Sequence, residues 1–91
     1  MPVQGPLPLD ARRRRALFRS QHRGMKETDV LLGRFAEQSL AAMSDDELAR
    51  FEALLEESDN DLLAWIMGRD PVPNDADQDL INIIKDFNNS I

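Results

Sequence analysis

Apolar residues recur along the chain every three to four positions, which is the spacing of one face of a helix. The spacing is clearest between about Lys26 and Ala42, where one stripe contains Leu32, Phe35, Ala36, Leu40 and Met43. The period-two alternation typical of strands is not sustained anywhere, and the chain has no tyrosine and little valine or threonine. The pattern therefore predicts an all-helical protein.

Signals for helix starts and ends divide the first half of the chain into three segments. A first helix is expected from Asp10, as its N-cap, to about Arg23, and Gly24 is expected to end it. The sequence Ser44-Asp45-Asp46-Glu47 is a capping box, so Ser44 is predicted to cap a third helix after the stripe described above. The expected buried face of this third helix contains Leu48, Phe51, Leu54 and Leu55.

The remainder of the chain predicts two more helices, separated by a connector over residues 69–74 with two prolines. Asp59 or Asn60 is expected to cap the fourth helix, Gly68 to end it, and a fifth is expected over about Asp75–Asn88. Their expected buried faces contain Leu62, Leu63, Ile66 and Met67, flanked by Trp65, and then Leu80, Ile83, Ile84 and Phe87. We predict a compact bundle of about five short helices, with a flexible segment over 1–9 and one domain over 10–91.

Composition narrows the classes of function. Apolar residues make up 42% and charged residues 31% of the 91 residues, which is typical of a small globular domain. The absence of cysteine excludes disulfides, thiolate metal sites and cysteine nucleophiles. No apolar run approaches the roughly 20 residues that span a bilayer, and the first nine residues do not resemble a secretory signal. We therefore expect a cytoplasmic protein without membrane insertion.

Charge is divided unevenly along the sequence. Residues 1–26 carry a net charge of +6, whereas the remainder carries −12. A basic end of this kind could bind nucleic acid, an acidic membrane surface or an acidic protein face. In a helix, the run Arg12–Arg15 would point around most of the circumference, because successive residues are about 100° apart. A solvated helix or a protein partner is therefore favoured over nucleic acid.

Catalysis finds little support in the sequence. The single histidine, His22, has no companion ligand or nucleophile nearby and is interpreted as a surface residue. The chain has no glycine-rich phosphate loop, no metal-ligand spacing and no nucleophile elbow. We therefore predict that the protein is not an enzyme and has no catalytic, metal-binding or cofactor-binding residues.

One cluster is not explained by helix signals alone, namely Arg23-Gly24-Met25-Lys26-Glu27. It places a basic residue, a methionine and an acid at one tight turn, which indicates an exposed recognition corner. The cluster also resembles the RGxxE signature of the SdhE family, the bacterial relatives of mitochondrial succinate dehydrogenase assembly factor 2. The resemblance covers about residues 12–68. It continues in Arg14, Leu17 and Phe18, in Asp29, Val30-Leu31-Leu32, Phe35 and Ala36, and in Leu54-Leu55-Glu56, Asp59, Asp61-Leu62 and Trp65-Ile66-Met67-Gly68.

The resemblance implies a chaperone-like assembly factor that binds the flavoprotein subunit of succinate dehydrogenase and promotes covalent attachment of FAD to a histidine of that subunit. It implies fumarate reductase flavoproteins as a possible second client. We also expect a monomer that holds no FAD itself. Of the family motif, Arg23, Gly24 and Glu27 carry over to this chain. We expect the partner-binding residues to be these three together with Met25, Lys26 and Asp29. Two alternatives stay open: an antitoxin-like regulator that binds another protein, and a nucleic-acid-binding protein that uses the Arg12–Arg15 run.

Overall fold

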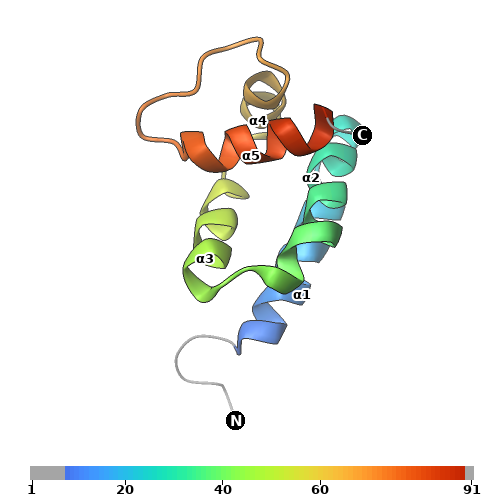
Figure 1. The fold of residues 1–91 in the computed structure, drawn as a ribbon. Coiled ribbons are helices and arrows are strands. Elements are labelled where there is room, and N and C mark those ends of the chain that lie inside the picture. The colour runs from blue at the N-terminus through green and yellow to red at the C-terminus, as the bar shows by residue number, and fades with distance from the viewer. Residues whose placement is uncertain (1–7, 90–91) are drawn as a thin grey trace.

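The computed structural model describes residues 8–89, and the described part is helical with no strand. The expected flexible segment over 1–9 lies almost entirely outside the described residues. The elements in chain order are α1 (Leu9–Gln21), α2 (Lys26–Ser39), the short 3-10 helix η1 (Leu40–Ala42), α3 (Asp45–Leu54), α4 (Asp59–Ile66) and α5 (Gln78–Asn89) (Figure 1). The predicted all-helical fold with five α-helices is therefore confirmed.

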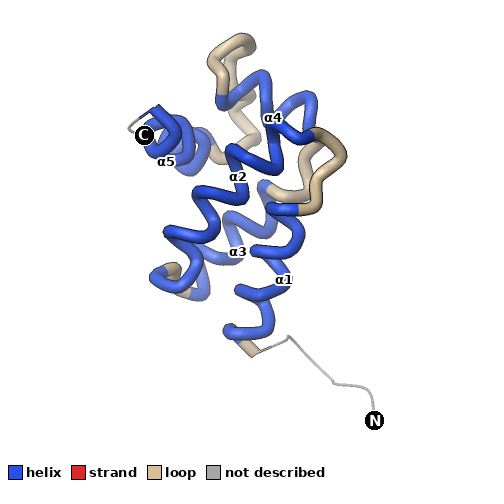
Figure 2. The backbone as a smooth tube through the Cα atoms, turned by 90° about the vertical axis from the view of Figure 1, so that its right-hand side faces the viewer, coloured by secondary structure: helices blue, strands red, loops and turns tan. Residues whose placement is uncertain are grey.

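The helices pack around one hydrophobic core. Helices α1 and α2 lie side by side, α3 packs against α1, and α5 crosses over α2 and α4 at the end of the molecule away from the N-terminus (Figure 1). The loop after α1 lies beside the loop after α3, close to the start of α4 (Figure 2). This meeting of two loops is where the sequence predicts the recognition corner.

Phe35 of α2 is the centre of the aromatic packing. Its ring centroid lies 5.8 Å from that of Phe51 on α3 and 5.7 Å from that of Phe87 on α5. These tilted and edge-on contacts join three helices, as aromatic pairs in cores commonly do. The buried apolar residues are Ala16, Leu32, Phe35, Ala36, Leu40, Met43, Leu48, Phe51, Leu54, Leu55, Leu62, Leu63, Trp65, Ile66, Leu80, Ile81 and Ile84.

Two predicted helix ends are confirmed. The side chain of Ser44 accepts a hydrogen bond from the Glu47 N–H at 3.2 Å, and the Glu47 carboxylate accepts one from the Ser44 N–H at 2.8 Å. Both halves of the predicted capping box are therefore present. After α4 the chain turns at Gly68, whose φ of 75° lies in the left-handed region that glycine adopts without a steric penalty.

Three predicted helix starts are wrong. Helix α1 begins at Leu9 with Pro8 in the N-cap position, so Asp10 lies inside its first turn. Helix α4 is capped by Ser58, whose Oγ accepts a hydrogen bond from the Asp61 N–H at 3.2 Å, rather than by Asp59 or Asn60. Helix α5 begins at Gln78 instead of about Asp75. Where several residues that commonly cap helices follow one another, the local sequence does not decide which of them becomes the N-cap.

The buried faces of α4 and α5 also differ from the prediction. Ile83 is 52% exposed and Met67 is 53% exposed, whereas Ile81 is completely buried. Met67 follows the last residue of α4, so the helical stripe no longer directs its side chain inward. In α5, Leu80, Ile81 and Ile84 face α2 and α4, and Ile83 lies at the edge of that face.

The arginine run of α1 is divided between two environments. Arg12 pairs with Asp45 and with Glu52 of α3, the latter at 2.7 Å, and Arg13 donates to the Met43 carbonyl at 2.8 Å. Arg14 and Arg15 are exposed. Half of the run therefore joins α1 to the residues around α3, and the other half faces solvent.

Among the described residues, none of the helices combines the length and hydrophobicity that a bilayer crossing requires.

Candidate partner-binding site

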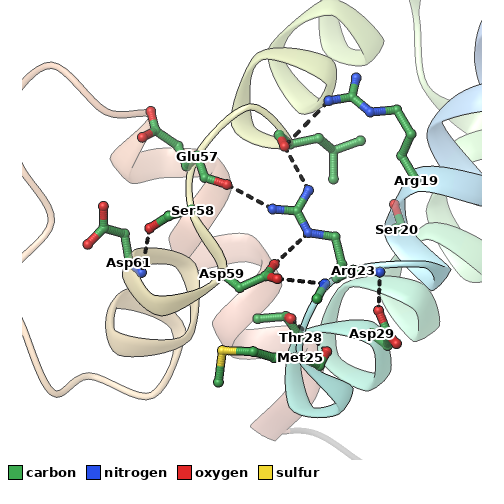
Figure 3. A network of polar contacts seen from close by, with 12 residues as sticks. Arg19, Ser20, Arg23, Met25, Thr28, Asp29, Glu57, Ser58, Asp59 and Asp61 are labelled. Atoms are coloured by element: carbon green, nitrogen blue, oxygen red, sulfur yellow. Dashed lines mark hydrogen bonds and ion pairs between the residues drawn. The ribbon is translucent and has the colours of Figure 1, made fainter.

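The corner between α1 and α2, residues 22–25, is built around the side chain of Arg23. Its Nε donates to Asp59 Oδ1 at 2.7 Å, its Nη1 to the Leu55 carbonyl at 2.7 Å, and its Nη2 to the Glu57 carbonyl at 2.8 Å (Figure 3). Only 11% of the Arg23 side chain is exposed. The guanidinium group is therefore directed into the protein and satisfied there.

The end of α3 explains why a cation is stable at this position. The last carbonyls of a helix have no partners within it and carry partial negative charge, so cations near that end are favoured. Arg19, one turn before Arg23, also donates to the Leu55 carbonyl, at 3.5 Å, and pairs with the carboxylate of Glu56. Arg19 on α1 and Arg23, four residues later in the corner, thus both bond to residues just after the C-terminal end of α3.

Asp59, the first residue of α4, links this cation to the backbone of the corner. Its Oδ2 accepts a hydrogen bond from the Gly24 N–H at 2.7 Å while its Oδ1 holds Arg23 (Figure 3). Burial alone would raise the pKa of this carboxyl, but Arg23, the Gly24 N–H and the Thr28 hydroxyl together hold that pKa below its ordinary value. Asp59 is therefore an ionised partner shared by the side chain of Arg23 and the backbone of Gly24.

Gly24 is distinguished by its close contact with Asp59 rather than by its backbone angle. The only positive φ in the described part of the chain belongs to Gly68, so the turn at Gly24 is made without a left-handed conformation. A Cβ at position 24 would lie 2.9 Å from Asp59 Oδ2, closer than real Cβ atoms approach an oxygen. The close contact at this glycine is therefore with Asp59 of the same chain.

The remaining residues of the predicted site separate into two sets. The carboxylate of Asp29 accepts a hydrogen bond from the Arg23 N–H, so Asp29, like Arg23, faces the corner itself. Met25, Lys26 and Glu27 instead line an open groove of about 710 Å³ between the start of α2 and the end of α4, hereafter the α2–α4 groove. Lys26 and Glu27 are exposed and make no ion pair with any described residue.

Thus Arg23, Gly24 and Asp29 shape the corner, while Met25, Lys26 and Glu27 present functional groups outward. Direct contact of any of the six with a partner stays a prediction. The sequence did not identify Asp59, Arg19 and Thr28 as members of this cluster. Arg19 could have been found from the sequence, because it lies four positions before Arg23. No local pattern indicates that Asp59, 36 positions after Arg23, is the partner of Arg23.

His22, interpreted from the sequence as a surface residue, is exposed. Its ring stacks on that of Phe18 with centroids 3.9 Å apart and an interplanar angle of 14°, and its Nδ1 lies 2.7 Å from the Phe18 carbonyl. Within residues 8–89, no group of three or more histidine or acidic side chains is arranged to hold a metal ion. At the predicted site, polar side chains converge in the corner and line the α2–α4 groove.

The structure thus defines a small helical bundle with an internally bonded corner beside an open groove that carries both charges. A family model described as flavinator of succinate dehydrogenase matches residues 14–88. The chain belongs to this family. The resemblance expected from the RGxxE cluster is therefore confirmed, and the match extends through α5, beyond the range over which the sequence motifs were recognised.

Individual relatives support the same assignment. The protein named FAD assembly factor SdhE from Acetobacter pasteurianus is 46% identical over 67 residues, covering 74% of this chain and 62% of that protein. Succinate dehydrogenase assembly factor 2-B, mitochondrial, from Drosophila ananassae is 33% identical over 87 residues, covering 93% and 53%. Succinate dehydrogenase assembly factor 2, mitochondrial, from Danio rerio is 35% identical over 81 residues, covering 87% and 51%. The chain thus spans between half and two thirds of the length of these relatives.

Proposed function

We propose that this chain binds the flavoprotein subunit of succinate dehydrogenase and promotes covalent attachment of FAD to that subunit. The family description and the names of the relatives support an assembly role connected with FAD and succinate dehydrogenase. The observation that carries the proposal within this chain is the corner, where the bonds of Arg23 and Gly24 to Asp59 fix the backbone that presents Met25, Lys26 and Glu27.

The chain acts in this proposal by binding and positioning. The outward groups of the corner are a thioether, an ammonium and a carboxylate, which are suited to contact apolar and charged parts of a protein surface. In the proposed reaction a histidine nitrogen of the client bonds to the 8α carbon of the oxidised flavin. The histidine N–H bond and one C–H bond of that carbon break, and the flavin ring takes up the two electrons and two protons and is left reduced. The factor contributes by favouring the client conformation in which the histidine and the flavin are close together. No residue of the factor exchanges a proton or an electron with the flavin.

The test is the amount of covalent flavin on the client. The flavoprotein subunit is expressed in cells that lack any factor of this family, with and without this chain, and flavin fluorescence is measured after denaturing electrophoresis. We expect a large rise in fluorescence with the chain present. Equal fluorescence in both samples would overturn the proposal.

The matched variant for this experiment is Gly24→Arg. It places a large side chain against Asp59 at the corner and should reduce covalent flavin while the helical circular dichroism signal is retained. Loss of the helical signal would instead assign Gly24 to folding.

Several further properties belong to the same proposal. The factor should not hold FAD, so a sample loaded with FAD and then desalted should show no flavin absorbance. Flavoproteins of the fumarate reductase type are proposed as a second class of client, and the same fluorescence assay with such a subunit tests this. A monomeric state and a cytoplasmic location stay predictions, for which sedimentation and cell fractionation are the measurements.

A further inference from the structure

The α2–α4 groove has an apolar floor that lies open. Val30 and Leu31 of α2 face Leu63 of α4 and Met67 just after it. Val30 is 43% exposed and Met67 is 53% exposed, and they are two of the four large apolar side chains that are most exposed in the described part of the chain. The other two, Phe18 and Ile83, are not part of this groove. The floor therefore concentrates apolar surface at one place, as protein-binding surfaces do.

The rim of the same groove carries more positive than negative charge. Lys26 and Arg69 line it together with one acid, Glu27, and none of the three makes an ion pair with any residue in 8–89. Five other arginines of the described part are each paired with a carboxylate, namely Arg12, Arg13, Arg19, Arg23 and Arg50. The chain has a net charge of −6, so carboxylates are in excess. Two unpaired cations beside an apolar floor are thus complementary to an apolar ligand that brings its own carboxylate.

We propose that the α2–α4 groove binds an apolar segment of the flavoprotein subunit that is flanked by a carboxylate. Aliphatic side chains of that segment pack on Val30 and Met67, and its carboxylate lies between Lys26 and Arg69. This inference rests on the proposed function, and it extends the site from the corner to the end of α4 and to Arg69. Methionine suits the position because its flexible thioether adapts to the shape of a partner.

Two pairs of variants test the groove against matched positions elsewhere. Met67→Asp is compared with Ile83→Asp, because the two side chains have nearly equal exposure, 53% and 52%. Arg69→Glu is compared with Arg34→Glu, because Arg34 is also an exposed arginine without an ion pair in residues 8–89 but lies outside the groove. The affinity of each variant for the purified flavoprotein subunit is measured by titration, with circular dichroism as the check of folding.

We expect Met67→Asp and Arg69→Glu to bind roughly tenfold more weakly or worse, and both control variants to bind within about twofold of the original chain. If the original chain binds and the groove variants bind equally well, the groove inference is overturned while the proposed function stands. If the original chain itself does not bind, the proposed function falls as well. Arg69 lies on the exposed connector, so Arg69→Glu remains a test even if Met67→Asp fails to fold.

A photo-cross-linking amino acid at position 67 identifies the occupant. We expect cross-links to a segment of the flavoprotein subunit that contains aliphatic residues and a carboxylate, and none from position 83. Cross-links to a second copy of this chain, together with a dimer in sedimentation that Met67→Asp abolishes, would overturn the assignment. Cross-links to a basic or wholly polar segment of the flavoprotein would overturn the stated chemistry of the ligand.

Discussion

Arg23 and Glu27 belong to one short motif but have opposite environments. Arg23 is almost completely enclosed and bonded to residues at the end of α3 and the start of α4, whereas Glu27 is exposed at the groove. Substitutions within the motif should therefore fall into two groups, one that changes stability and one that changes partner binding. The following two predictions separate these groups.

Replacing Asp59 by alanine should destabilise the protein. The substitution leaves the charge of Arg23 enclosed without its carboxylate and removes the acceptor of the Gly24 N–H. We expect the free energy of unfolding to fall by about 1.5–3 kcal/mol, the range for hydrogen bonds to charged groups. Urea unfolding measures this, with Asp61→Ala as the control, because Asp61 lies exposed on the same first turn of α4. Equal effects of the two substitutions would contradict the role assigned to Asp59.

Replacing Glu27 by alanine should weaken binding of the flavoprotein subunit with little effect on stability. An exposed acid in the first turn of a helix contributes only about 0.3–1 kcal/mol to that helix. We therefore expect the melting temperature to change by a few degrees at most, while the titrated affinity falls clearly. A large fall in melting temperature with unchanged affinity would show that Glu27 is a structural residue.

The residues of the corner show what the sequence could and could not predict. The motif itself was recognisable because its residues are adjacent in the sequence. Which of them point inward and which outward was not predicted. The bond between Arg23 and Asp59 was not predictable, because it joins two loops whose meeting depends on how α1 packs on α3. Asp59 is also a residue type that commonly caps helices, so the sequence offered capping as its role. In the structure Ser58 caps α4 instead.

At the scale of the element, helix starts with a reciprocal pattern were predicted better than those without one. Ser44 and Glu47 specify each other, so the start of α3 was predicted correctly. Helix α5 has apolar residues on adjacent positions, and local periodicity could not decide whether Ile81 or Ile83 faces the core. The packing of α2 and α4 makes that choice, and it buries Ile81.

The arginine run of α1 supplies the prediction at this scale. Arg12→Gln should lower the melting temperature, because Arg12 pairs with two acids, Asp45 and Glu52, and its side chain is only 15% exposed. Arg15→Gln should change the free energy of unfolding by less than about 0.5 kcal/mol, as is usual for exposed positions. Thermal unfolding at low and high salt measures both, and the effect of Arg12→Gln should shrink as salt is raised. Equal melting temperatures of the two variants at low salt would show that the ion pairs of α1 do not stabilise it.

At the scale of the whole molecule, ion pairs join segments of opposite net charge. The basic first part of the chain folds onto acidic residues of the remainder through Arg12, Arg19 and Arg23. A further pair joins Arg50 of α3 to Asp77, just before α5, at 2.7 Å. Part of the basic charge of the first segment is thus neutralised by ion pairs with acidic residues of the remainder.

This arrangement predicts that acid destabilises the protein. Hydrogen bonds from Ser44 lower the pKa of Glu47, hydrogen bonds from Arg50 lower that of Asp77, and the pKa of Asp59 is also lowered despite its burial. The unfolded chain therefore binds protons more readily than the folded one, so the contribution of these groups is fully present above their ordinary pKa of about 4 and is lost as the pH falls below it. Urea unfolding between pH 7 and pH 3 measures the effect, and Asp77→Asn should flatten the acid side of the curve. Constant or rising stability with falling pH would contradict this prediction.

The bonds of Arg23 to Leu55, Glu57 and Asp59 have a consequence for anyone who wishes to imitate or block this surface. A peptide copied from residues 20–30 contains every residue of the motif, yet it lacks the three groups that bond to the Arg23 guanidinium. One of these groups, the Asp59 carboxylate, also accepts the hydrogen bond from the Gly24 N–H. Such a peptide should compete poorly for the partner even at high concentration. The motif is continuous in sequence, but its conformation depends on residues from a second loop. If the corner binds the partner as proposed, a useful mimic has to reproduce the junction of the two loops.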